Sequence, residues 1–143
     1  IFNLIDGLGV KDFQIKGPEN FQAANLVHLN TSFIFDKKAI QLKKGEFVEI
    51  LHPTPSICGL PRQEAADFIR SNEKHERSYY TGVLGPVNDN AETHLYVNLR
   101  CMQLFEHEIV LYSGAGIIDS SSPEKEWIET SNKLLTLLRY IHV

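Results

Sequence analysis

The pattern of hydrophobic and polar residues in the first half of the chain predicts one strand and one short helix. Residues 26–35 begin with alternating apolar and polar side chains and are rich in β-branched and aromatic types, as in a strand. Residues 41–51 carry apolar side chains at loosely helical spacing, and the prolines that follow prevent a helix from continuing. We therefore expect a short helix that ends at His52. Residues 52–61 hold three prolines and a glycine, which favours a shaped loop without a regular element.

The pattern in the second half predicts a helix, three strands and a longer final helix. A proline at position 61 and the apolar stripe that follows it indicate a helix running to about residue 72. The period then becomes two over residues 80–87, 94–102 and 109–113, which is typical of an antiparallel meander. Three serines before Pro123 are a helix-start signal, so the last helix is expected from there to about Tyr140.

These elements indicate an α+β fold in which helices pack on one face of an antiparallel sheet. The chain has 143 residues, of which 43% are hydrophobic and 22% charged, as in one compact domain. No linker or low-complexity tract interrupts residues 1–143, so no internal domain boundary is expected. The chain begins with Ile1 rather than methionine, and we therefore expect it to be a fragment of a longer protein.

Charge and composition exclude several classes of function. The net charge is −4 and the 14 basic residues are scattered, which argues against nucleic acid as a partner but leaves a small anion possible. No apolar run approaches the roughly 18 residues that span a bilayer, and the start lacks the basic residues of a signal peptide. The two cysteines form no metal-binding or redox pair. A cytoplasmic protein without a membrane partner is expected.

The last predicted helix carries a group of charged side chains on one face. Glu126, Glu129 and Lys133 follow one another at i, i+3 and i+7, so they project in a similar direction. One interpretation is a solvated face with a Glu129–Lys133 ion pair. The other is a Mg²⁺ site, because this ion prefers carboxylate oxygens and usually takes one or two of them beside an anionic substrate. Spacing alone favours the first interpretation.

Several other residues have a plain structural interpretation and a chemical one. The Gly114-Ala115-Gly116 segment is a turn whose backbone N–H groups could also approach a carboxylate. Arg100, at the end of the middle strand, is a surface residue or a bidentate carboxylate clamp. Tyr80, at a strand start, is a packing residue or a hydrogen-bond donor to an anion. His52 either caps a helix end or acts as an acid, base or donor.

The order of these segments resembles the carboxy-terminal half of the chorismate-binding enzymes, a family that includes isochorismate, salicylate, anthranilate and aminodeoxychorismate synthases. The similarity runs from about Ala24 to Ile141 and is weak before it. Five blocks in the right order and spacing carry it, with an additional similarity in ANLVHLNT at 24–31. The blocks are HPTPSICGLPR at 52–62, SYYTGVLG at 78–85, LRC at 99–101, LYSGAGI at 111–117 and SPEKEWIETSNKL at 122–134.

The resemblance implies a role for each candidate near a magnesium ion. Glu129 would bind Mg²⁺, Glu126 would lie in or beside the metal shell, and Lys133 would lie near the metal-bound substrate. His52 would line the site near the ring carbon that loses its hydroxyl group.

The resemblance also implies how the substrate carboxylates are held. The turn at Gly114, Ala115 and Gly116 would offer backbone N–H groups to one carboxylate. Arg100 and Tyr80 would hold the enolpyruvyl carboxylate. Chorismate is a dicarboxylate, so a metal ion and an arginine would together answer its two charges.

Within the family, the HPTPSICGLPR and LYSGAGI blocks are most similar to isochorismate synthases, which serve menaquinone and siderophore biosynthesis. The implied reaction is the isomerisation of chorismate to isochorismate, in which water adds at one ring carbon and the 4-hydroxyl leaves. The lysine base, the glutamate acid and a second metal-binding glutamate would lie in a missing amino-terminal half, so the fragment alone should be inactive. The alternatives are a salicylate or anthranilate synthase, or a non-catalytic chorismate-binding fragment.

Overall fold

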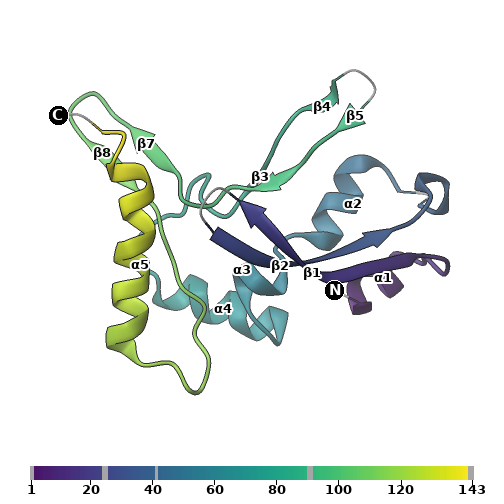
Figure 1. The fold of residues 1–143 in the computed structure, drawn as a ribbon, viewed down its shortest axis with the longest axis horizontal. Coiled ribbons are helices and arrows are strands. Elements are labelled where there is room, and N and C mark those ends of the chain that lie inside the picture. The colour runs from purple at the N-terminus through teal and green to yellow at the C-terminus, as the bar shows by residue number, and fades with distance from the viewer. Residues whose placement is uncertain (1, 24–25, 41, 90–91, 142–143) are drawn as a thin grey trace. The chain divides into compact units, whose positions relative to one another are not determined.

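The computed structural model describes residues 2–23, 26–40, 42–89 and 92–141 (Figure 1). The chain divides into two compact units, Ile1–His52 and Pro53–Val143. Each unit contains both helices and antiparallel strands, which confirms the predicted α+β class. The expectation of one domain without an internal boundary stays a prediction, because compact packing units do not by themselves define domains.

The first unit is a β-hairpin with helices before and after it. Helix α1 (Phe2–Gly7) precedes strands β1 (Gln14–Ala23) and β2 (Leu26–Ile34), which pair antiparallel. A 3₁₀ turn, η1 (Lys37–Ala39), and helix α2 (Lys44–Leu51) follow. The buried core of this unit consists of Ile5, Leu8 and Val10. Partly buried apolar side chains from β2, α2 and the connecting segments pack against it.

The predictions for this unit are confirmed for β2 and α2. The helix begins at Lys44, later than the pattern indicated, and Gln41 lies outside the described residues. Strand β1 was not predicted. Its sequence contains Gly17 and Pro18 at a register shift between Lys16 and Glu19, and such residues obscure the alternation that marks a strand.

The second unit opens with two helices. Helix α3 (Pro55–Cys58) lies inside the segment that was expected to be an irregular loop, so that expectation is wrong. A single turn forms there because Pro55 occupies the first helical position after an extended Thr54. Helix α4 (Arg62–Asn72) confirms the next prediction, with Pro61 as its N-cap and Glu73 as its C-cap.

The strands of the second unit do not form the predicted three-stranded meander. Among the described residues they are short and pair in twos: β3 (Val83–Leu84) with β6 (Tyr96–Val97), β4 (Val87–Asp89) with β5 (Glu92–Thr93), and β7 (Met102–Leu104) with β8 (Ile109–Leu111). Asn88 and Arg100 have φ values of 58° and 50°, in the left-handed region that interrupts an extended strand. Gly85 is required where it stands, because a Cβ there would lie 1.9 Å from the carbonyl oxygen of His94.

Helix α5 (Pro123–Leu138) confirms the predicted last helix and ends two residues earlier than expected. Pro123 begins it and Ser122 is the N-cap, although the Ser122 hydroxyl donates to the Glu124 carboxylate at 2.7 Å instead of capping a backbone N–H. No helix in the described part of the chain combines the length and the hydropathy required to cross a membrane.

Candidate functional site

The charged face of α5 is joined to the glycine turn by one lysine. Lys133 Nζ lies 2.5 Å from Glu129 Oε1 and donates to the carbonyl oxygen of Gly114 at 2.9 Å. The ion pair expected from spacing is therefore present. The same ammonium also links the helix to a residue 19 positions earlier, which spacing within a helix does not reveal. Glu126 is half-buried on this helix.

The Gly114-Ala115-Gly116 turn lies against α5 with its donors available. Ser113 Oγ donates to the backbone oxygen of Thr130 at 3.1 Å, which anchors the start of the turn to the helix. Among the described residues, none accepts a hydrogen bond from the backbone N–H groups of the turn. Free N–H groups that follow one another along a turn are suited to an anion.

The Tyr80 hydroxyl lies beside this turn, and its ring packs on a neighbouring tyrosine. A Cβ added to Gly114 would lie 2.6 Å from Tyr80 Oη, so the phenol occupies the space that a side chain would need. The Tyr80 ring stacks on Tyr112, with centroids 5.5 Å apart and planes at 21°. Burial raises the pKa of Tyr80, so at neutral pH its hydroxyl keeps the proton that it would donate to a carboxylate.

Two of the sequence-based placements need correction. Tyr80 does not start a strand: it lies in a turn before β3, where its N–H donates to the carbonyl oxygen of Arg77 at 2.7 Å. Arg100 does not end a strand either: it lies between β6 and β7 with φ near 50°. The residue is half-buried, and its guanidinium forms no ion pair within the described part of the chain. It is therefore available to an anion.

His52 lies at the end of the first unit, as the C-cap of α2. Its backbone N–H donates to the carbonyl oxygen of Val48 at 2.8 Å, which agrees with the plain structural interpretation. A role in the site stays a prediction.

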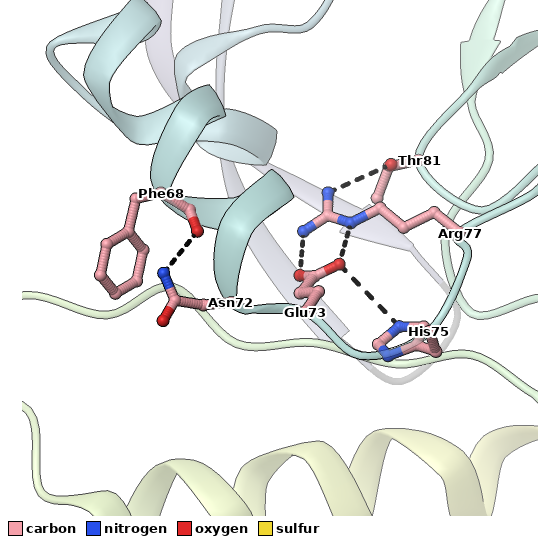
Figure 2. Close-up of polar contacts among 6 residues, drawn as sticks. All are labelled: Phe68, Asn72, Glu73, His75, Arg77 and Thr81. Atoms are coloured by element: carbon pink, nitrogen blue, oxygen red, sulfur yellow. Dashed lines mark hydrogen bonds and ion pairs between the residues drawn. The ribbon is translucent and has the colours of Figure 1, made fainter.

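The structure also shows a polar cluster that sequence reasoning missed. Two nitrogens of Arg77 donate to the carboxylate of Glu73, and one of them, Nε, lies 2.7 Å from Glu73 Oε2. The third nitrogen lies 3.3 Å from Thr81 Oγ1 (Figure 2). The hydrogen bond from Arg77 lowers the pKa of Glu73, and the same bond raises the pKa of Arg77. The only signal in the sequence is the i, i+4 spacing, which usually marks a helix surface and here follows the end of α4.

The donor set on α5 fits part of a magnesium site. Glu126 and Glu129 supply carboxylate oxygens from one helix, and Mg²⁺ completes its shell with water and substrate oxygens when protein carboxylates are few. The described residues contain no group of three or more potential metal ligands, so further ligands must come from elsewhere. Lys133 would have to leave Glu129 when a cation binds there, and the Gly114 carbonyl can retain it.

Tyr80, Gly114, Lys133 and Glu129 are thus connected by direct contacts, and they come from three of the five blocks recognised in the sequence. A family model described as chorismate binding enzyme matches residues 8–142. The chain belongs to the chorismate-binding enzyme family.

Several curated relatives of the chain are isochorismate synthases. The vibriobactin-specific isochorismate synthase of Vibrio cholerae serotype O1 is 33% identical over 121 residues, which cover 85% of this chain and 31% of that protein. Isochorismate synthase EntC of Escherichia coli K12 is 36% identical over 121 residues, again 85% of this chain and 31% of the relative. Isochorismate synthase DhbC of Bacillus subtilis is 40% identical over 98 residues, 68% of this chain and 25% of the relative.

A solved structure has the same fold over nearly the whole chain. It is from Bacillus anthracis and is provisionally named a 2,3-dihydroxybenzoate-specific isochorismate synthase, DhbC. The TM-score is 0.80 at 30% identity, and the match covers 96% of this chain and 37% of that one. The chain therefore has the fold of roughly a third of a larger protein, a smaller share than the half that the sequence indicated.

Proposed function

We propose that the chain is the carboxy-terminal part of a magnesium-dependent isochorismate synthase, which isomerises chorismate to isochorismate. The observation that carries the proposal is the set of contacts joining Tyr80, Gly114, Lys133 and Glu129 in a chain whose relatives are isochorismate synthases. Tyr80 and Gly114, which the resemblance assigned to the anion, are linked here through Lys133 to Glu129, which it assigned to the metal.

The proposed role of each residue follows from the chemistry of its side chain or backbone. Arg100 and the Tyr80 hydroxyl bind the enolpyruvyl carboxylate, because a guanidinium and a protonated phenol both donate to it. The N–H groups of the turn at residues 114–116 bind the second carboxylate, with Lys133 beside it. Glu126 and Glu129 hold Mg²⁺, which when bound neutralises the ring carboxylate and orients the substrate. The family resemblance assigns His52 a role near the reacting carbon.

The chain does not supply the acid and base that the isomerisation needs. Water must lose a proton as it adds to the ring, and the departing 4-hydroxyl must gain one. We propose that a lysine and a glutamate in a preceding amino-terminal segment do this, and that this segment is the partner of the chain. Two facts support such a partner: the chain spans 31% of the relatives' length, and it exposes many large apolar side chains.

The experiment that tests the proposal uses the complete protein carrying this chain, with chorismate and Mg²⁺, and identifies the product by chromatography and mass spectrometry. Isochorismate is expected from the wild type. Glu129→Gln should lower turnover at least about a hundredfold while leaving the melting temperature within a few degrees, because it removes a charged metal ligand without changing shape. Glu124→Gln, on the same helix but outside the site, should retain activity.

Other products would overturn the assignment in distinct ways. Salicylate would identify the enzyme as a salicylate synthase, and anthranilate in the presence of ammonia would identify an anthranilate synthase. Binding of chorismate with no product would identify a non-catalytic binding protein. Full activity of Glu129→Gln would remove Glu129 from the metal site.

A further inference from the structure

The turn that carries Tyr80 has an unfavourable backbone. Ser78 and Thr81 both lie in the left-handed region, at φ 50° and 63°, where residues with a Cβ are uncommon. Two hydrogen bonds close the turn: Tyr80 N–H to Arg77 O at 2.7 Å and Gly82 N–H to Tyr79 O at 3.1 Å. Such a backbone persists only where the surrounding structure holds it.

One support comes from the segment that follows β6. Asn98 donates through its side-chain amide to the carbonyl oxygen of Tyr79 at 2.9 Å. Its backbone oxygen accepts from Thr81 N–H at 2.8 Å, and its own N–H donates to Gly82 O at 2.8 Å. Asn98 therefore holds the end of the turn that leads into β3.

The other support is the ion pair between Glu73 and Arg77. Their side chains are 30% and 25% exposed, and two guanidinium nitrogens of Arg77 donate hydrogen bonds to the Glu73 carboxylate (Figure 2). The third nitrogen reaches Thr81 Oγ1, on one of the left-handed residues. Arg77 begins the turn, and its guanidinium links Glu73, the C-cap of α4, to Thr81 near the end of the turn.

Arg77 also lies near the ring that the turn presents. Its guanidinium carbon is 5.9 Å from the centroid of the Tyr80 ring, within the range of a cation–π contact. Each of the three guanidinium nitrogens already has a protein partner, which uses three of the five N–H donors of Arg77. We therefore expect Arg77 to act on substrate binding through the turn that it holds.

We propose that Glu73 and Arg77 are positioning residues that hold the 77–82 turn so that the Tyr80 hydroxyl stays beside Gly114, where it meets the substrate carboxylate. The proposal rests on the proposed function for the identity of the substrate. The position of the turn itself does not depend on that identity, so the two can be tested separately.

The test compares Arg77→Ala, Arg77→Lys and Glu73→Gln with the wild type in the complete protein. Hydrogen exchange, followed by mass spectrometry of a peptide covering residues 78–82 without substrate, should be at least about fivefold faster in all three variants. KM for chorismate should rise about tenfold with kcat changed less than about threefold. Arg77→Lys should not restore the wild-type exchange rate or KM, because one ammonium cannot bind the Glu73 carboxylate and Thr81 Oγ1 at the same time.

A matched control breaks another arginine–carboxylate ion pair, which lies on α4 itself. Arg70 lies 2.8 Å from Asp67 on the exposed side of α4, with side chains 74% and 53% exposed. Arg70→Ala should change neither the exchange of the turn nor KM.

A second comparison asks whether the effect passes through the phenol. In a Tyr80→Phe background, Arg77→Ala should change KM less than twofold, because the group that it positions is already absent. Unchanged exchange in Arg77→Ala, rescue by Arg77→Lys, or an equal KM effect in the Tyr80→Phe background would each overturn the proposal. If the wild type does not convert chorismate, the proposed function fails, and hydrogen exchange still decides whether the pair holds the turn.

Discussion

At the scale of single residues, the contact between Gly114 and Tyr80 is the tightest steric constraint in the candidate site. The Tyr80 hydroxyl lies 2.6 Å from where a Gly114 Cβ would stand, so the phenol can occupy this position only beside a glycine. The sequence could indicate that both belong to the site, because they stand in family blocks. It could not indicate their contact, because 34 positions separate them along the chain.

The first residue-scale prediction concerns Gly114→Ala. A methyl group 2.6 Å from Tyr80 Oη must push the phenol aside, so KM for chorismate should rise about tenfold in steady-state assays of the complete protein. Gly45→Ala is the control, because a Cβ on that glycine in α2 meets nothing within 4 Å. An unchanged KM in Gly114→Ala would show that the phenol does not bind the substrate.

The second residue-scale prediction concerns Glu73 and pH. Its pKa is lowered in the folded protein by Arg77, so its charged form contributes stability above the unfolded value near 4.5, and this contribution is lost as pH falls through the lowered pKa. Relative to Glu73→Gln, the wild type should be more stable by about 1 kcal/mol at pH 7, a modest figure because the pair is partly exposed.

Urea unfolding at a series of pH values measures this difference. The advantage of the wild type over Glu73→Gln should shrink as pH falls below the unfolded value and disappear once Glu73 is protonated in the folded protein. Asp67→Asn, which breaks the exposed pair on α4, should show a difference below about 0.5 kcal/mol at every pH. A difference for Glu73→Gln that does not change with pH would contradict the assigned ion pair.

At the scale of elements, helices were more predictable than strands. The serines and proline before α5 and the charged spacing along it are local signals, and local signals decide helix starts and faces. The predicted strand at residues 94–102 is interrupted where Arg100 adopts a left-handed backbone conformation. Nothing in the alternation of residues 94–102 marks Arg100 as the break, since arginine rarely adopts that conformation.

An element-scale prediction concerns the competition on α5. Lys133 occupies the Glu129 carboxylate, so Lys133→Met should tighten Mg²⁺ binding about fivefold in calorimetry without substrate, as expected for an ion pair worth about 1 kcal/mol. Lys74→Met is the control, because that exposed lysine follows α4 and lies outside α5. Equal or weaker Mg²⁺ binding in Lys133→Met would contradict a metal site at Glu129.

At the scale of the whole molecule, the amount of exposed apolar surface is the main feature. Tyr79, Leu29 and Trp127 are 82%, 77% and 75% exposed, and in the described part of the second unit only Cys58 among the apolar side chains is buried. Proteins that work alone rarely expose so many large apolar groups. The family and the length of the relatives were needed to propose a missing partner, because the composition of the chain is that of an ordinary domain.

The prediction at this scale is that the chain alone has no activity and associates non-specifically. Purified residues 1–143 should bind a hydrophobic dye, elute as large species in size-exclusion chromatography and convert no chorismate. Co-expression with the preceding segment should yield a discrete species with activity. Conversion of chorismate by the isolated chain would contradict the proposed location of the acid and base.

The double attachment of Lys133 has a thermodynamic consequence for the order of binding. The lysine joins a carboxylate of the proposed metal site to the carbonyl of the proposed anion turn. A ligand that displaces it from either end changes the free energy of binding at the other, and such coupling is reciprocal by necessity. Magnesium and chorismate should therefore alter each other's affinity by the same factor, whichever of them arrives first.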